Sequence, residues 1–386
     1  FTPVNYPAND VASAWRTTHF DFHAIHDNIL KLDLLGHDDP TVIKLLQEWT
    51  KVKIEDISFS DKKVLELFSS TKPLGIEPKD INNEQTGVLG IPEFGTKFVR
   101  KMLKVAKPAS FNDLINISGL SHGTNVWNGN AEDLIKQGKK LNEVISCRDD
   151  IMVYLMKKGV DPSSSFQIME KVRKGKGLTP EDEKLLKENG IESWYINSLN
   201  KIKYMFPKAH ATAYVMMAWR IAWFKIYYPL EYYAAFYTVR PDVFDLESAI
   251  SSKEKIEKKI KELEAKQYAN SKEKITQKEE SLIPIFEIIN EMLARGFKIL
   301  NIDLNLSEAT SWKIDYQNKA LIPPFIVVDG LGIAAANSIV EARNKKAFTS
   351  KDDLIKRTLI NKTTLDKFEN LGIINHLNST DQIKLF

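Results

Sequence analysis

Cationic side chains that could bind phosphate occur in two stretches of the chain. The segment VRKGKG supplies Arg173 and Lys174 beside glycines, and YMFPKAHATAY supplies Lys208 and His210 directly after a proline. Because an interior proline disrupts a helix, we expect Lys208 and His210 in a helix's first turn. Unpaired backbone N–H groups there attract phosphate. The sequence favours a phosphate-binding site, with a plain core helix as the alternative.

A single carboxylate, Asp33, lies within the short apolar run ILKLDLLG. An unpaired carboxylate is costly to bury, so Asp33 is a candidate metal ligand. Four histidines occur in the same region: His19, His23, His26 and His37. They lack a partner thiolate or a His–Glu spacing on one helix. We therefore interpret them as ordinary hydrogen-bonding side chains near a substrate or the core.

The run SGLSHGTNVWNGN is rich in glycine, serine and asparagine, which predicts a functional loop. His122 and Trp127 are its candidate exposed side chains. A nucleophilic pair of His122 with Ser118 or Ser121 is disfavoured, because neighbours in sequence rarely face each other. No third partner for such a pair is visible in the sequence.

Two further helices are expected to carry clustered charges. In CRDDIMVYLM, Arg148 precedes Asp149 and Asp150, which suit the helix dipole better than a magnesium site. The helix expected at 96–105 carries a basic stripe on one face. Its members are Lys97, Arg100, Lys101 and Lys104. Such a stripe is usually a solvated face, and beside nucleic acid it would contact phosphates.

Near the C-terminal end, VVDGLGIAAANSIVEARNKKAF has the helix-hairpin-helix pattern. Gly330 and Gly332 allow a tight hairpin, and Arg343 and Lys345 give the following helix a basic end. Such a hairpin binds backbone phosphate without sequence preference. A second, degenerate copy follows, with Gly372 as its remaining glycine. The lysine-rich segment before this region predicts a solvated helix or helical hairpin.

The composition describes a soluble globular chain of two or three modules. It has 386 residues, 43% hydrophobic and 27% charged, with a net charge of +3. One cysteine, Cys147, excludes an internal disulfide framework and a cysteine-cluster zinc site. We expect neither a membrane helix nor a signal peptide. Because the chain starts at Phe1, we expect it to be a piece of a longer polypeptide.

Several long runs together resemble the PolC-type alpha subunit of bacterial replicative DNA polymerase III. They are THFDFHAIHDNILKLDLLGHDDPT, GIPEFGTKFVRKML, ISGLSHGTNVWNGNAEDLI, CRDDIMVYLM, VRKGKG and YMFPKAHATAYVMMAWRIAWFK. The resemblance covers the whole chain as that family's C-terminal portion. It implies a mostly α-helical fold with a small β remnant of the palm. The implied parts are the palm end (1–60), fingers (61–240), a duplex-binding domain with tandem helix-hairpin-helix (241–376) and a clamp-binding tail (377–386).

The resemblance also implies roles for individual residues. Asp33 would be the third palm carboxylate and share two Mg²⁺ ions with an Asp-x-Asp pair that this chain lacks. The residues implied to meet the incoming dNTP are His122, Arg148, Arg173, Lys174, Lys208 and His210. Those implied at duplex DNA are Gly330, Gly332, Arg343 and Lys345. Gln382, Leu385 and Phe386 in the final QIKLF would anchor the sliding clamp.

The implied function is template-directed nucleotidyl transfer by two metal ions in the cytoplasm. Template-primer DNA, dNTPs, the sliding clamp, other replisome subunits and the N-terminal remainder of the polymerase would be partners. With one palm carboxylate, the chain alone is expected to be inactive. The alternatives are a stand-alone DNA- and clamp-binding adaptor and a non-catalytic soluble helical protein. Neither alternative requires Asp33 or the cationic fingers residues.

Overall fold

The computed structural model describes residues 2–26, 28–32, 36–240, 244–268 and 275–380. The chain divides into two compact units, Phe1–Asp38 and Asp39–Phe386. In the first unit, β1 (Val4–Asn5) pairs antiparallel with β2 (Thr17–Thr18), and the short α1 (Phe22–Ile25) follows. Asp33 lies outside the described residues.

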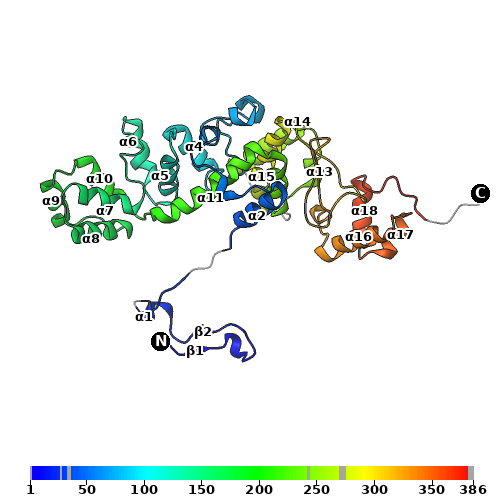
Figure 1. The fold of residues 1–386 in the computed structure, drawn as a ribbon, viewed down its shortest axis with the longest axis horizontal. Helices are drawn as coiled ribbons and strands as arrows, with labels where there is room; N and C mark the ends of the chain where they lie inside the picture. The colour runs from blue at the N-terminus through cyan, green and yellow to red at the C-terminus, as the bar shows by residue number, and fades with distance from the viewer. Residues whose placement is uncertain (1, 27, 33–35, 241–243, 269–274, 381–386) are drawn as a thin grey trace, which may run out of the picture. The chain divides into compact units, whose positions relative to one another are not determined.

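The second unit is mostly helical, as the sequence predicts (Figure 1). Its first helices are α2 (Asp39–Thr50), α3 (Lys62–Leu67), α4 (Lys97–Ala106), α5 (Phe111–His122), α6 (Glu132–Lys136), α7 (Arg148–Lys157), α8 (Pro162–Arg173), α9 (Pro180–Glu188) and α10 (Ser193–Lys201). Then come α11 (Lys208–Tyr227), α12 (Pro229–Thr238), α13 (Leu246–Ala249), α14 (Lys253–Tyr268), α15 (Gln277–Ala294), α16 (Ile333–Lys345), α17 (Lys351–Arg357) and α18 (Lys362–Asn370).

Helix α11 is the central element of residues 61–240, the range expected to form the fingers. Pro207 is its N-cap, and Lys208 and His210 occupy its first turn as predicted. Small and aromatic residues on its buried face, among them Ala218 and Trp219, allow α2, α3, α5, α7 and α12 to pack against it. Pro229 starts α12. The two prolines therefore set where both helices begin.

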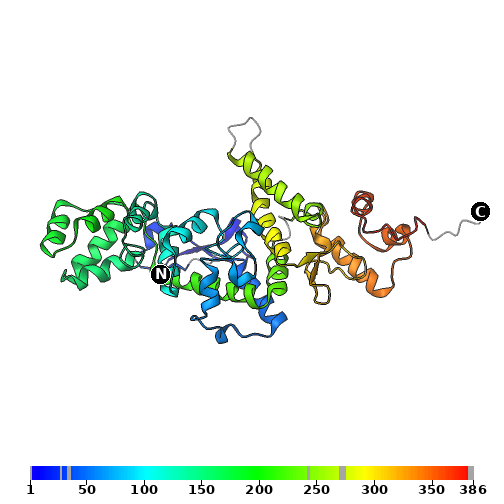
Figure 2. The same cartoon turned by 90° about the horizontal axis from the view of Figure 1, so that it is seen from above.

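The charged helical hairpin predicted after the fingers is present, but only one of its helices is solvated. Helices α14 and α15 lie side by side (Figure 2). Helix α15 is largely buried, including the polar residues Asn290 and Glu291. A three-stranded sheet follows in the order β3 (Lys298–Ile299), β5 (Ala320–Ile322), β4 (Lys313–Asp315). The sheet contacts α12, so it is part of the same core.

The prediction of a loop with exposed side chains at residues 118–130 is wrong in two respects. Its first part is the end of α5, where Gly119 is buried. A Cβ at Gly119 would lie 2.4 Å from Cys147 Sγ, so this glycine permits close packing rather than a turn. Trp127, expected to be exposed, is 4% exposed and starts a short π-helical turn (Trp127–Ala131). His122 is exposed, as expected.

Candidate functional site

The N-termini of α7 and α11 meet and bring together two predicted phosphate ligands, Arg148 and Lys208. The backbone N–H of Lys208 donates to Asp149 Oδ2 at 2.7 Å. The Lys208 ammonium donates to Asp150 Oδ1 at 2.8 Å. The backbone N–H of Arg148 donates to the Phe206 carbonyl at 3.2 Å, which joins the start of α7 to the residues before α11. One polar cluster therefore contains two helix ends and two cations.

Both aspartates lie in the first turn of α7, as expected from the helix dipole, and Asp150 also has a capping role. It accepts hydrogen bonds from the Cys147 backbone N–H (2.9 Å) and from Ser146 Oγ (3.0 Å). Burial alone would lower the pKa of Lys208, but the hydrogen bond from Lys208 to Asp150 raises it overall. Burial raises the pKa of the Cys147 thiol to about 12, so this thiol is not a ready nucleophile or metal ligand.

A column of rings leads from α5 to α11 beside this cluster. His122 stacks on Phe206 with ring centroids 4.6 Å apart. Phe206 meets His210 edge-on at 4.9 Å, and His210 stacks on Tyr214 at 4.4 Å. The two histidines predicted as dNTP ligands are therefore linked through Phe206. Ring faces of this kind can support a nucleobase by stacking.

Glu93 contacts His122, the first ring of this column, and nothing in the sequence singled out Glu93 as a site residue. Its Oε2 lies 3.1 Å from His122 Nε2 and 3.5 Å from Ser118 Oγ. Glu93 has a φ of +67°, a left-handed conformation that is uncommon for a residue other than glycine. Only the position of Glu93 between glycines in GIPEFG hinted at an unusual turn.

The expectation that neighbouring serine and histidine do not face each other is wrong for Ser121. Its Oγ lies 2.9 Å from His122 Nδ1. Both groups also lie within hydrogen-bond distance of the Ser118 carbonyl, at 2.8 and 3.0 Å. The contact therefore belongs to the end of α5, and the conclusion that this is no nucleophilic pair is retained.

Arg173 and Lys174 lie at the end of α8, and both pair with Glu170. The nitrogen–oxygen distances are 2.7 Å for Arg173 and 3.1 Å for Lys174. The Arg173 hydrogen bonds lower the pKa of Glu170 to about 2. The following Gly175, at φ +69°, packs so tightly that a Cβ would lie 2.4 Å from the Lys203 carbonyl. This packing fixes the basic loop against the segment that leads to α11.

The helix-hairpin-helix expectation can be followed in detail. A 3-10 turn (Phe325–Val327) precedes the hairpin, Gly330 adopts φ +81°, and Gly332 is the N-cap of α16. Gly372 also has a positive φ, +74°, and turns follow it over residues 371–376. Each predicted hairpin therefore has one glycine with a positive φ. A residue with a side chain at that position would strain the backbone.

The two predicted DNA-binding cations of α16 differ in their surroundings. Arg343 donates to the carbonyls of Leu304 and Ser307, and its side chain is 10% exposed. These bonds attach α16 to the segment between β3 and β4. Lys345 is exposed. Lys345 is thus available to phosphate, whereas Arg343 has a structural role in this arrangement.

The expectation of a solvated basic stripe on α4 is wrong for Arg100, which is buried, and only in part correct for the whole stripe, because Lys101 and Lys104 are exposed. Arg100 is 4% exposed and pairs with Glu287 at 2.9 Å and Glu84 at 3.4 Å. Lys97 pairs with Glu264 at 2.7 Å. The stripe attaches α4 to α14 and α15, whose carboxylates are remote in sequence.

No cluster of three or more His, Cys, Asp or Glu side chains suitable for a metal occurs within the described ranges. Asp149 and Asp150 do not fit a magnesium ion, because they already accept hydrogen bonds from Lys208 and Cys147. We therefore assign no metal-dependent step to them. The clamp-binding candidates Gln382, Leu385 and Phe386 lie outside the described residues. Within the described part, no helix is long and apolar enough to span a membrane.

Comparison with known proteins agrees with this architecture. Residues 39–192 match the family of bacterial DNA polymerase III alpha subunit finger domains, and residues 296–383 match a helix-hairpin-helix motif family. The whole chain is 57% identical to a PolC-type DNA polymerase III of Mycoplasmopsis pulmonis, of which it covers 27%. It is 54% identical to that of Ureaplasma parvum (27% covered) and 50% to that of Bacillus subtilis (26% covered). The chain thus spans about a quarter of these relatives' length.

Proposed function

Because the chain belongs to the PolC-type DNA polymerase III family as a portion of about a quarter of its members' length, we propose that it supplies the fingers and duplex-binding parts of a replicative DNA polymerase. The observation that carries this proposal is the meeting of Arg148, Lys208 and the His122–His210 ring column at the N-termini of α7 and α11. Cations suited to phosphate and rings suited to stacking on a base lie together in this small region.

In the proposed mechanism, the triphosphate of an incoming dNTP binds at the start of α11. Its oxygens would accept from the Lys208 backbone N–H and ammonium, which now donate to Asp149 and Asp150. Cations placed there offset the negative charge that develops during nucleotidyl transfer. Arg173 and Lys174 are proposed as further phosphate ligands once they leave Glu170. The ring column would support the base of the dNTP.

Metal chemistry would come from the palm. Two magnesium ions held by palm carboxylates, with Asp33 proposed as one, would activate the primer hydroxyl and stabilise the leaving pyrophosphate. The proposed divisions are palm end 1–60, fingers 61–240, duplex-binding domain 241–376 and tail 377–386. Without the other palm carboxylates, we expect no polymerisation by this chain alone.

DNA and clamp binding are proposed for the remaining parts. The hairpin at Gly330 and Gly332 would offer backbone N–H groups to a phosphate, with Lys345 beside it. Gln382, Leu385 and Phe386 would anchor the tail to a sliding clamp. Burial of Leu385 and Phe386 contributes about 1.5–3 kcal/mol each, so the tail alone should bind weakly. Tail and DNA contacts would act together through effective concentration. The other replisome subunits are also proposed partners, and the cytoplasm is the proposed location.

Primer extension tests the proposal. The chain is assayed with magnesium and four dNTPs, alone and with a separately supplied N-terminal portion that carries the other palm carboxylates. We expect extension only in the mixture and expect Asp33→Ala to abolish it. Lys208→Gln should raise the KM for dNTP, whereas Lys184→Gln, an exposed lysine on α9, should not.

Two results would contradict the proposal. Extension by the chain alone would mean that the catalytic carboxylates have been misplaced. Absence of extension from a mixture that forms a stable complex, with duplex DNA and clamp still bound, would favour the adaptor function. The adaptor has some support in the structure, since the phosphate-binding cations at Lys208 and Arg173 are already paired with carboxylates.

A further inference from the structure

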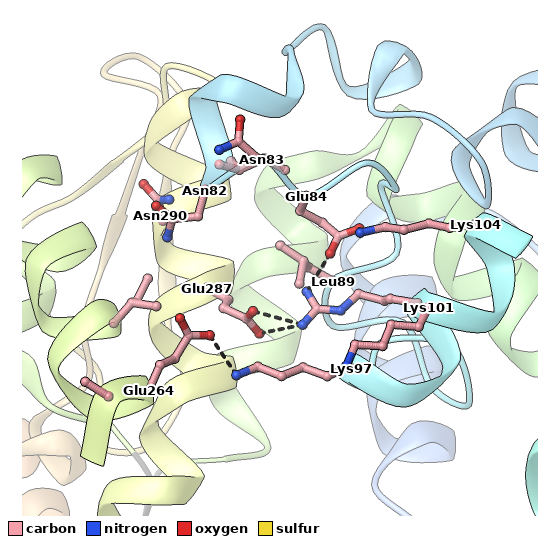
Figure 3. Close-up of a pocket in the computed structure, with 14 residues that line it drawn as sticks. Asn82, Asn83, Glu84, Leu89, Lys97, Lys101, Lys104, Glu264, Glu287 and Asn290 are labelled. Atoms are coloured by element: carbon pink, nitrogen blue, oxygen red, sulfur yellow. Dashed lines mark hydrogen bonds and ion pairs between the residues drawn. The ribbon is translucent and has the colours of Figure 1, made fainter. Parts of the chain in front are cut away.

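Two cavities of the second unit differ in whether their polar side chains already have partners. In the cavity between α4 and the helical hairpin, three basic side chains lie within ion-pair distance of carboxylates, among them Lys97 with Glu264 at 2.7 Å (Figure 3). The other, the α5–α7 cavity, has a volume of about 290 Å³ and is lined by α5, residues 142–146, α7, Tyr195 of α10 and Lys208. A cavity of this size suits a small molecule.

Two deeply buried side chains of the α5–α7 cavity carry polar atoms without a hydrogen-bond partner among the described residues. Asn116 of α5 is 4% exposed, and Tyr195 is 3% exposed. Their amide and hydroxyl groups are not among the side-chain atoms that are closed off from water, so both groups are accessible from the cavity. Buried polar groups without a partner are rare in native proteins and indicate that a water molecule or a ligand pairs with them.

Asp149 adds a third acceptor to the α5–α7 cavity. Its Oδ2 accepts from the Lys208 backbone N–H at 2.7 Å and lies 4.0 Å from Arg148 Nε. Its other oxygen has no partner in the part of the chain that the structure describes. A carboxylate oxygen, the Asn116 amide oxygen and the Tyr195 hydroxyl oxygen therefore face one small space. An ammonium group, which has three donors and no acceptor, can pair with all three.

The charges that line the α5–α7 cavity also favour a cation. The lining contains three carboxylates, on Glu143, Asp149 and Asp150, and two cations, on Lys157 and Lys208. Lys208 already pairs with Asp150 at 2.8 Å. Lys157 ends α7, about 12 Å along the helix from Asp149 at 1.5 Å per residue. The Asp149 end of the cavity is therefore negative and disfavours phosphate and other anions.

The remaining walls of the α5–α7 cavity are apolar and aromatic. Val144, Ile145 and Val153 supply aliphatic surface, and Tyr154 stacks on Tyr195 with ring centroids 4.3 Å apart. Aliphatic surface suits methylene groups, and tyrosine faces attract an alkylated ammonium. This mixed lining fits an aliphatic amine better than a hard inorganic cation, which prefers a full set of oxygen ligands.

We propose that the α5–α7 cavity binds the ammonium group of a small aliphatic amine. The ammonium donates to the free oxygen of Asp149, to Asn116 Oδ1 and to the Tyr195 hydroxyl oxygen, and the methylene groups lie against the aliphatic wall. The site shares Asp149 with the Lys208 cluster but requires neither a nucleotide nor a metal ion. The inference therefore does not rest on polymerase activity.

Calorimetric titration of the full chain with putrescine, a short diamine, at constant ionic strength tests the proposal. Tyr195→Phe removes only a hydroxyl that has no partner in the protein, and it should weaken binding about tenfold, because a hydrogen bond from a charged donor is lost. Asn116→Leu should act in the same direction. Lys157→Gln should strengthen binding about twofold, because it removes a like charge. The matched controls Tyr204→Phe and Asn197→Leu change exposed residues outside the cavity and should leave the affinity unchanged.

The outcomes separate the proposal from its rivals. Equal affinities of the Tyr195→Phe and Tyr204→Phe proteins would overturn it. Weaker binding to Lys157→Gln would also overturn it, because the cavity would then favour an anion. Butylamine should bind more tightly than ammonium or potassium ions, and equal affinities would refute the assignment to an aliphatic amine. Absence of binding at tens of millimolar putrescine would mean that water alone pairs with Asn116 and Tyr195.

Discussion

The buried ion pair between Lys225 of α11 and Glu291 of α15 should be a strong determinant of stability. Both side chains are 0% exposed, and their nearest nitrogen and oxygen are 2.8 Å apart. The ammonium also donates to the carbonyls of Gly87 (2.7 Å) and Leu89 (2.6 Å). Tyr233 donates its hydroxyl hydrogen to Glu291 at 2.6 Å. Three segments remote in sequence thus meet at one charge pair.

Replacing Lys225 with methionine preserves much of the side-chain volume but removes the charge. Glu291 is then a buried carboxylate without its cation, and two backbone carbonyls lose their donor. Breaking a buried pair in this way costs about 3–5 kcal/mol. We expect Lys225→Met to lower the free energy of unfolding by that amount, measured by denaturant titration followed by circular dichroism.

The double variant Lys225→Met/Glu291→Leu is the critical comparison. An apolar pair of similar volume often replaces a buried ion pair at little cost, so the double variant should recover most of the lost stability. The control Lys184→Met removes an exposed lysine and should cost less than about 0.5 kcal/mol. If Lys225→Met costs as little as this control, or the double variant is less stable than Lys225→Met, the assigned role of the pair is wrong.

The same pair predicts a pH dependence. Burial lowers the pKa of Lys225 to about 8 from an ordinary value of 10.5. Between these values the unfolded chain binds more protons than the folded chain, so this lysine makes the free energy of unfolding rise with pH. The slope is at most about 1.4 kcal/mol per pH unit. Cys147, whose pKa burial raises to about 12, acts in the opposite direction.

We therefore compare the pH dependence of the wild-type chain with that of the double variant, because the Cys147 effect is common to both. Between about pH 8 and 10, the wild-type stability should rise relative to the double variant. Parallel curves over this range would show that Lys225 titrates at its ordinary pKa despite its burial.

Four further substitutions have defined outcomes. Glu93→Gln should weaken dNTP binding several-fold, because His122 loses its carboxylate partner; an unchanged affinity in binding titrations would contradict this role. Gly119→Val should lower the free energy of unfolding by about 1–3 kcal/mol, because its side chain would overlap Cys147, and a stability loss below 0.5 kcal/mol would argue against this packing. Lys345→Gln should weaken duplex DNA binding and reduce the salt dependence of that binding. Arg343→Gln should mainly lower the thermal unfolding midpoint. If Arg343→Gln weakens DNA binding and Lys345→Gln lowers the midpoint instead, the roles assigned to the two residues are exchanged.

Features set by local chemistry could be predicted from the sequence. Pro207 and Pro229 determined where α11 and α12 start, because a proline restricts the helix positions it can occupy. Gly330 and Gly332 indicated a hairpin before α16, and the structure has one with a positive φ at Gly330. In these cases the controlling interaction lies within a few residues of the predicted feature.

Features set by distant partners could not be predicted in this way. Gly119 suggested a turn, but its lack of a side chain makes room for Cys147. Arg100 suggested a solvated stripe, but its partner Glu287 comes from α15. The role of Glu93 depends on a left-handed backbone and on His122 of another helix. The sequence shows which residues are basic, but it does not show which carboxylates they pair with in the fold.

The pairing of cations with carboxylates has a consequence for how the proposed site selects its ligand. At α11, an entering phosphate must displace Asp149 and Asp150 from Lys208, and at α8 another must displace Glu170 from Arg173. A single phosphate gains few contacts for this cost, whereas a triphosphate can replace several carboxylate contacts at once. The affinity of the site for a triphosphate should therefore exceed its affinity for a monophosphate by more than the difference in net charge between the two ligands would give. The same carboxylates keep the cations oriented until the nucleotide arrives, so less side-chain ordering remains to oppose its binding.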